Sequence, residues 1–330
     1  MCATCGAQSP CRTSGRTRED YPDCHRPLLG TSLGRVAELL AWWNRFHGCG
    51  ADPRLGELQR AVLKRLAADR TRFSEVVEPS CSLDETGWHF LRFSYAVPGF
   101  RADPVGDAGD LLALCRPFGE ALSEQVRALL GPARHQAVSL PLMGIAYDAA
   151  DAWRVKLYLQ FADDAGDEPL GIAARLSGRS DLASLFRGRH LHLIGIDLGA
   201  RGIAGAKLYF RLPQVRLADV ARVAGPVALL DDLAGSGVEA LRNLLVIHRM
   251  RRRDDPALER AAEVDFALPE NDLCWEDLAA SPIVQRARAG DSPLAALEGA
   301  FTLGVRRVSV AVGRADKLNV YFVLNEIDPA

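Results

Sequence analysis

Five pairs of strand-like segments constrain the fold of this 330-residue chain more than any other feature. The clearest pair is 138–147 with 152–161, which flanks the turn Asp148-Ala-Ala-Asp151. Four further pairs share its alternation of apolar and polar residues: 75–83 with 88–96, 190–197 with 204–211, 243–250 with 263–268, and 305–312 with 317–324. The sequence therefore predicts an antiparallel sheet of about ten strands.

Segments with helical periodicity lie before and between these pairs, because their apolar residues recur every three or four positions. They are 33–46, 55–73, 110–130, 181–187, 217–233, and 275–301 with a break at Ser292-Pro293. A constant alternation of two strands and a helix indicates one repeating architecture rather than two domains. Closing such a sheet removes its exposed edges and places the helices outside. We expect an α+β fold: one ten-stranded antiparallel αββα barrel over residues 31–330, preceded by a disordered tail over residues 1–30.

The overall composition excludes several functions. Hydrophobic residues make up 48% and charged residues 25%, as in soluble globular proteins. A net charge of −2 and a pI near 6.4 give no global attraction to nucleic acid or to an anionic membrane. No apolar run reaches the ~18–20 residues of a spanning helix.

The N-terminal segment carries no apolar region of the kind found in secretory signals, so we expect a cytoplasmic protein with reduced thiols. Four of the eight cysteines, Cys2, Cys5, Cys11 and Cys24, lie in this segment. Their irregular spacing favours a disordered leader over a structural zinc site.

Three strands carry cations and tyrosines on one face, because residues two apart in a strand share a face. These residues are Arg154, Lys156, Tyr158 and Gln160; Lys207, Tyr209 and Arg211; and Lys317, Asn319 and Tyr321. A sheet with one face in water would show the same alternation. Water-exposed faces usually include acids, however, and these positions carry none. If helices cover the apolar face, the cations and tyrosines line the lumen.

A lumen rich in ammonium, guanidinium and phenol groups is costly to desolvate unless it holds an anion. Lys and Arg can neutralise a diphosphate, and tyrosine hydroxyls can donate to its oxygens. Tyrosine rings can stabilise a neighbouring carbocation. Ionisation of an allylic diphosphate needs both a held leaving group and a shielded cation.

The run Arg154-Val-Lys156-Leu-Tyr158 resembles the R-x-K-x-Y signature of the ABBA or PT-barrel prenyltransferases. Over residues 70–325 the chain is most similar to the cyanobactin-type peptide prenyltransferases. The motifs that carry this resemblance are Glu78-Pro-Ser-Cys81, Arg92-Phe-Ser-Tyr95, Leu193-Ile-Gly-Ile-Asp197 and Leu208-Tyr209. Pro79 departs from the family's alanine. The basic run Arg249-Met-Arg-Arg-Arg253 is also not expected of the family, and a solvated loop is favoured there over a binding patch.

The resemblance implies a prenyltransferase with a dimethylallyl or geranyl diphosphate donor. The diphosphate would be held by Arg92, Lys156, Lys207 and Lys317, aided by Arg154 and Asn319. The carbocation would be shielded by Tyr158, Tyr209 and Tyr321. Glu78 would take the acceptor's proton, and the alternative role for Glu78 is a salt bridge to Arg92. The resemblance also implies Mg²⁺ bound mainly through the diphosphate, no metal held by the protein alone, and a monomer.

The expected acceptor is a side chain of a cyclic peptide. The chain ends six residues after position 324, which leaves no helix to close that mouth of the barrel. A bulky peptide would then complete the closure. Two alternatives stay open: the same fold acting on a free indole or phenol, and a non-catalytic barrel that binds an anion.

Three other motifs have weaker functional interpretations. Asp163-Asp-Ala-Gly-Asp167 matches the DDxxD string of helical isoprenyl synthases, but Gly166 and a preceding strand favour a turn. His190 and His192 share a strand face and either touch substrate or lie in water at the strand end. Trp42-Trp43 and Phe46 have helical spacing typical of core.

Overall fold

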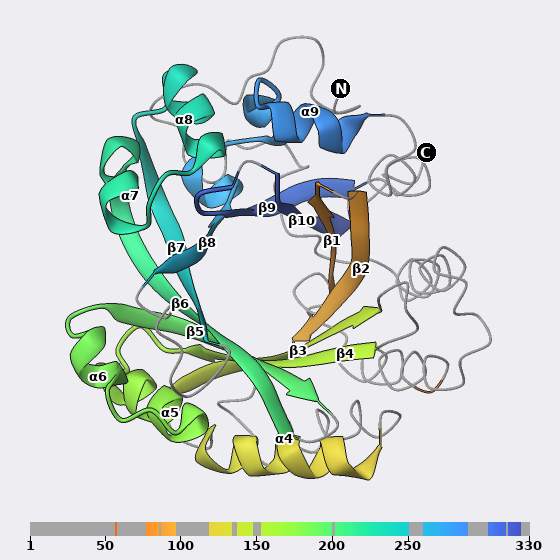
Figure 1. Ribbon diagram of the computed structural model, residues 1–330, viewed down its shortest axis with the longest axis vertical. Coiled ribbons are helices and arrows are strands. Elements are labelled where there is room, and N and C mark those ends of the chain that lie inside the picture. Colours follow the sequence, from red (N-terminus) through yellow and green to blue (C-terminus); the bar gives the residue numbers. More distant parts are fainter. Residues whose placement is uncertain are drawn as a thin grey trace, which may run out of the picture.

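The computed structural model describes residues 77–85, 87–96, 119–133, 137–147, 153–199, 202–250, 260–289, 303–314 and 316–324, together with Glu57. Ten antiparallel strands form a closed barrel in the order β1-β10-β9-β8-β7-β6-β5-β4-β3-β2 (Figure 1). They are β1 Val77–Asp84, β2 Gly87–Ala96, β3 Val138–Tyr147, β4 Trp153–Phe161, β5 His190–Gly199, β6 Gly202–Arg216, β7 Ala240–Met250, β8 Ala261–Ala267, β9 Leu303–Ala311 and β10 Leu318–Leu324. The five predicted hairpins and the closed barrel are confirmed.

Closure depends on the pairing of the first strand with the last. On β1, Ser80 lies opposite Tyr321 of β10 on one side and opposite Arg92 of β2 on the other. Beyond this seam, β6 is longer than predicted, because the strand continues past Arg211 through Pro213 and still pairs with β7. Pro213 is exposed there, where the missing backbone donor is tolerated.

The helices lie around the outside of the barrel (Figure 1). They are α4 Glu120–Ala133, α5 Glu168–Ser177, α6 Leu182–Leu185, α7 Leu217–Val223, α8 Ala228–Gly235 and α9 Pro282–Arg288, with the short 3₁₀ helices η6 Pro269–Asn271 and η7 Trp275–Leu278. None of the helices in these described ranges is long and apolar enough to cross a membrane.

Two helix predictions need correction, and one further helix is present. The continuous helix over 217–233 is wrong: Gly225, at φ 104°, and Pro226 separate α7 from α8. The helix expected from residue 275 is divided at Ser281, because Pro282 starts α9. Helix α5 was not predicted. It begins with Glu168-Pro169, and Gly178 ends it in the left-handed region at φ 67°.

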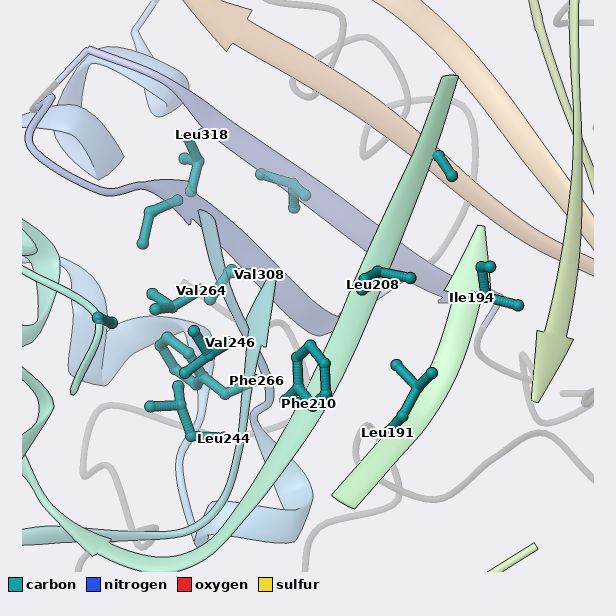
Figure 2. Close-up of a cluster of buried hydrophobic side chains, with 14 of the residues drawn as sticks. Leu191, Ile194, Leu208, Phe210, Leu244, Val246, Val264, Phe266, Val308 and Leu318 are labelled. Carbon is teal, nitrogen blue, oxygen red and sulfur yellow. The ribbon is translucent and has the colours of Figure 1, made fainter. Parts of the chain in front are cut away.

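The main core lies between the barrel wall and the helices. Val155, Leu157, Leu159 and Phe161 of β4 are all at most 5% exposed. The same layer buries Ala206, Leu208 and Phe210 of β6 and Leu318, Val320 and Phe322 of β10. Figure 2 shows part of this layer, with Leu208 and Phe210 near side chains of β7, β8 and β9. Burying one such side chain stabilises the fold by about 1.5–3 kcal/mol. Summed over the whole layer, this burial keeps the apolar face of the strands against the helices. The alternate, polar face therefore points into the lumen.

Some predictions fall outside the described residues. These are the tail over 1–30, the segment 33–46 with Trp42-Trp43 and Phe46, the segment 55–73 apart from Glu57, the first part of 110–130, and the break at Ser292-Pro293.

Candidate active site in the barrel lumen

The lysines and tyrosines of the lumen lie at different depths. Strands β4, β6, β8 and β10 run in one direction, because neighbouring strands are antiparallel. In β4 and β6 a lysine precedes a tyrosine by two positions. Lys317, directly before β10, and Asn319 within β10 precede Tyr321. All three cations are therefore displaced from the tyrosines toward the same mouth of the barrel.

A group we call the Glu263 cluster occupies one side of the lysine level. The Glu263 carboxylate is 2% exposed and accepts from Lys207 Nζ at 2.7 Å, Lys317 Nζ at 2.8 Å and Arg249 Nη2 at 2.8 Å. The Ser309 hydroxyl lies 3.4 Å from the same carboxylate. Three cations thus share one buried anion, which leaves the cluster with excess positive charge.

Burial and charge oppose each other in this cluster. Burial alone would raise the pKa of Glu263, but Lys207 and Lys317 lower it well below its usual range. Burial lowers the pKa of Lys207 to about 7, although Glu263 opposes that shift. Lys317 and Arg249 also bond the Glu263 carboxylate, so Lys207 is not its sole counter-ion.

The sequence did not predict Glu263 or Arg249 as site residues. The strand predicted over 243–250 contains Arg249, and this is confirmed, since Arg249 lies in β7. Its guanidinium bonds Glu263, so the solvated loop favoured for the basic run from Arg249 is wrong for this residue. The rest of the basic run, residues 251–253, lies outside the described residues. Only a short pattern in the sequence could have indicated Glu263 as a lumenal residue: Glu263 and Asp265 alternate with the buried Val264 and Phe266 in β8.

A second group of cations faces an open pocket, which we call the rim pocket. It is lined by Ser80, Arg92, Ser94, Gly144, Ile145, Ala146, Arg154, Lys156, Tyr158, Asp197 and Tyr321. Arg92 donates to Asn319 Oδ1 at 3.1 Å, and its guanidinium carbon lies 5.8 Å from the Tyr321 ring centroid. Lys156 Nζ lies 2.8 Å from Asp197 Oδ1, a carboxylate that is 45% exposed. The predicted diphosphate residues Arg92, Arg154 and Lys156 are thus brought together at one opening.

Two glycines fix the position of the Tyr158 ring. A Cβ on Gly195 of β5 would lie 2.8 Å from Tyr158 Cε1, and a Cβ on Gly144 of β3 would lie 2.9 Å from Tyr158 Cε2. The ring therefore lies close against the barrel wall across both neighbouring strands. Its edge contacts Tyr209, whose ring centroid is 6.4 Å away at an interplanar angle of 66°.

The tyrosines also belong to a small apolar patch inside the lumen. Tyr209, Leu245 and Ile247 form this patch, and Tyr158 and Leu193 pack against it. The main core on the outer face of the wall is a separate cluster. An apolar surface beside two aromatic rings suits a hydrocarbon chain or an aromatic ring better than a charged group.

Acidic groups lie beyond the tyrosine level. Ser82 of β1 pairs with Asn319 and Ser80 pairs with Tyr321, so Glu78, the next residue on that face, is further from the lysines. Arg307 of β9 lies opposite Tyr321, and its Nε is 3.4 Å from Asp265 Oδ1. Burial raises the pKa of Asp265 to about 7, Arg307 opposes this, and Glu78 adds to it. Glu78 therefore lies near a second lumenal carboxylate.

The salt bridge proposed as the alternative role of Glu78 is not among the ion pairs of the described residues, since Arg92 donates to Asn319 instead. Asn319 also accepts from Ser82 Oγ at 2.8 Å, so its oxygen orients Arg92 from β10. Lys207 and Lys317 bond Glu263, and their role in holding a diphosphate stays a prediction.

Together, a closed αββα barrel and a lumen of cations, phenols and carboxylates define the class of fold: this is a PT barrel. No protein-family model matches the sequence, and no curated protein matches it. Solved structures of prenyltransferases do match the fold. 6-Dimethylallyltryptophan synthase from Micromonospora olivasterospora, solved with DMASPP and Trp, matches with a TM-score of 0.64 at 17% identity, over 89% of this chain and 98% of that one.

Two more structures extend the comparison. 5-Dimethylallyltryptophan synthase from Streptomyces coelicolor matches with a TM-score of 0.65 at 18% identity, over 89% of this chain and 97% of that one. AnaPT from Neosartorya fischeri matches with a TM-score of 0.54 at 15% identity, over 90% and 93%. At these identities the comparisons establish the fold.

Proposed function

We propose that this protein transfers a prenyl group from an allylic diphosphate, dimethylallyl diphosphate in the first instance, to a free aromatic molecule of the indole class. The observation that carries this proposal is the order of groups along the lumen: cations at the rim pocket, tyrosines next, and Glu78 with Asp265 beyond them. A barrel that only binds an anion has no use for a carboxylate such as Glu78 on the far side of the tyrosines.

The acceptor is where the proposal departs from the expectation of a cyclic peptide. The matching 6-dimethylallyltryptophan synthase was solved with DMASPP and Trp, and PriB, a further match, was solved with L-tryptophan and dimethylallyl thiolodiphosphate. No comparison supports a peptide acceptor. The apolar patch of Tyr209, Leu245 and Ile247 also fits a small aromatic ring.

The reaction requires the donor to ionise. Arg92, Arg154 and Lys156 would bind the diphosphate as its carbon–oxygen bond breaks, with the electron pair leaving on the phosphate oxygen. Lys156 can exchange its ion pair with Asp197 for one with the diphosphate at little cost, because an ion pair with a half-exposed carboxylate contributes only about 0–1 kcal/mol. The faces of Tyr158 and Tyr209 would shield the allylic cation from water.

Bond formation requires a base. An aromatic carbon of the acceptor would attack the cation, and the ring would then lose the proton from that carbon. Glu78 would accept this proton, while the diphosphate leaves through the rim pocket. Magnesium, if present, would arrive on the diphosphate, and Asp197 is a carboxylate of the rim pocket that could complete its coordination.

The direct test is product analysis by mass spectrometry. The full chain is incubated with dimethylallyl diphosphate and, separately, with tryptophan, a simple indole, a phenol, and linear and cyclic peptides that contain tryptophan or tyrosine. We expect the mass of one C5 unit to be added to a free indole, with diphosphate released in equal amount. Transfer to peptides alone would reject the proposed acceptor class. Diphosphate binding without transfer to any acceptor would reject the enzyme activity.

A further inference from the structure

A cluster of three potential metal ligands lies at the end of the barrel away from the lysines. His190 and His192 come from the start of β5, and Asp163 comes from the turn after β4. One ligand atom from each residue lies within 4.8 Å of the other two. A β-bulge between Leu191 and Leu193 opens the pairing with β6 where His192 lies.

This cluster is separate from the diphosphate site. His190 lies opposite Arg211, which follows Lys207 by four positions on β6, with Tyr209 between them. The cluster therefore lies on the other side of the tyrosine level from the Glu263 cluster. Asp163 and the two histidines also do not line the rim pocket.

The imidazoles have unmet bonding capacity. His190 Nε2 and His192 Nδ1 are shielded from solvent and have no hydrogen-bond partner within the part of the chain that the structure describes. A buried polar atom without a partner typically costs about 1–3 kcal/mol, so such atoms usually have a ligand, a water molecule or a specific role. An imidazole nitrogen that carries no proton offers a lone pair to a metal ion.

We propose that Asp163, His190 and His192 bind a divalent transition metal, with Zn²⁺ the best fit, and leave a coordination position for water or another ligand. Two imidazoles and one carboxylate suit Zn²⁺, Co²⁺, Ni²⁺ or Cu²⁺, whereas Mg²⁺ and Ca²⁺ prefer all-oxygen sites. Three protein ligands with one open position is also the arrangement of many catalytic zinc sites.

The geometry needs only side-chain rotation to close around an ion. Zinc–ligand distances are ~2.0–2.2 Å. The three ligand atoms, which now lie within 4.8 Å of one another, must therefore move somewhat closer together. Asp163 can provide this movement, because its side chain is 73% exposed on a turn. His190 is 30% exposed, and its Nε2 already lies 3.6 Å from Asp163 Oδ1.

Arg211 is the competitor of the metal. Its Nη1 lies 3.0 Å and 3.2 Å from the two carboxylate oxygens of Asp163. A bound cation would have to share or replace that contact, and the guanidinium charge would repel it. Removing Arg211 should therefore tighten metal binding, whereas removing any of the three ligands should weaken it.

The test is a Co²⁺ titration followed by visible absorption, with Zn²⁺ affinity from competition with a chromophoric chelator, on the full chain after removal of any affinity tag. We expect d–d bands without a sulfur-to-cobalt charge-transfer band. Zn²⁺ affinity should fall at least about tenfold in His190→Ala, His192→Gln and Asp163→Asn, and rise in Arg211→Gln. Asp164→Asn removes the adjacent exposed carboxylate and should leave affinity unchanged.

A further variant excludes the N-terminal thiols. Replacing Cys2, Cys5, Cys11 and Cys24 together by serine should leave this Zn²⁺ site intact. Circular dichroism of each variant checks the fold, and the three ligand variants provide independent tests if one of them misfolds. The proposal is overturned if Zn²⁺ binds parent and ligand variants equally, if binding disappears with the cysteines, or if no binding is detected at any position.

Discussion

The lumen contains two groups of cations that look alike in sequence and differ in the structure. Lys207, Arg249 and Lys317 surround Glu263, a carboxylate that is 2% exposed. At the rim pocket, Arg92 is oriented by the neutral Asn319, and Lys156 pairs with an exposed Asp197. The first group already holds a buried anion, while the second faces an opening. Cationic residues in a strand therefore do not by themselves identify a diphosphate site; the partner of each cation decides whether it is available.

The largest effect is expected on removing the shared anion. Glu263→Gln would leave three cations without their buried carboxylate, and breaking a buried ion pair in this way typically costs about 3–5 kcal/mol. Urea unfolding should show this loss in the free energy of unfolding. Glu276→Gln is the control, because its ion pair with Arg288 is about one-third exposed on both sides and should contribute about 0–1 kcal/mol.

Glu263→Gln should also differ from the parent in its response to pyrophosphate. Added pyrophosphate should stabilise Glu263→Gln more than the parent, because the released cations can bind it. If both proteins unfold at the same urea concentration, with and without pyrophosphate, Glu263 is not the counter-ion of this group.

The next prediction concerns which of the two groups of cations binds the diphosphate donor. Lys156→Met should weaken binding of a dimethylallyl thiolodiphosphate by about 1.5–3 kcal/mol, the contribution of a charged hydrogen bond. Lys317→Met removes an equal charge from the Glu263 cluster, and we expect it to weaken donor binding at least about tenfold less than Lys156→Met does. Isothermal titration calorimetry measures both. Equal losses would show that donor binding uses the two groups alike.

A smaller effect should follow from crowding Tyr158. Gly195→Ala places a methyl group 2.8 Å from the ring, and such overpacking typically costs about 1–3 kcal/mol. The ring must move from the wall, so product formation should fall as well. Gly171→Ala in α5 is the control, since its added carbon would contact only Arg175 at 3.7 Å. Gly195→Ala with parental stability and turnover would show that the ring position is not constrained.

The pH dependence of stability tests the acid side of the lumen. Burial raises the pKa of Asp265 from its ordinary 3.8 to about 7. Between these values the folded state holds a proton that the unfolded state releases, so this group costs the fold progressively more from about pH 4 to pH 7. Asp265→Asn should therefore gain stability relative to the parent over that window. Chemical unfolding at several pH values measures this difference, and the exposed Asp231→Asn should track the parent.

The strand pairs and the lumenal face could be predicted because both depend on local period-two patterns. Lys156-Leu-Tyr158 and Lys207-Leu-Tyr209 show that pattern within three residues. The pairing partners could not be predicted this way. Glu263 is 56 positions from Lys207 and 54 from Lys317, and only the closed barrel brings them together.

The sequence was also less informative where one residue type suits two environments. Arg249 belongs both to the predicted strand 243–250 and to a basic run typical of a loop, and only the structure shows that its guanidinium bonds Glu263 inside the barrel. The sequence pattern did not predict helix α5, because the turn-forming residues directly before it, Asp163 to Asp167, are the stronger local signal. The His190 and His192 pair was recognised, but Asp163 joins it only through the pairing of β4 with β5.

In the proposed reaction, the tyrosines separate a donor-holding side of the lumen from a proton-accepting side. Glu78→Gln keeps the shape of the side chain and removes its basicity. Turnover and donor affinity are measured on the same preparation, at the pH optimum of the parent. We expect kcat to fall about 10²–10⁴-fold, the usual contribution of general-base catalysis, with donor affinity unchanged. A Glu78→Gln protein that keeps the parental kcat, or that loses donor affinity instead, would contradict this expectation.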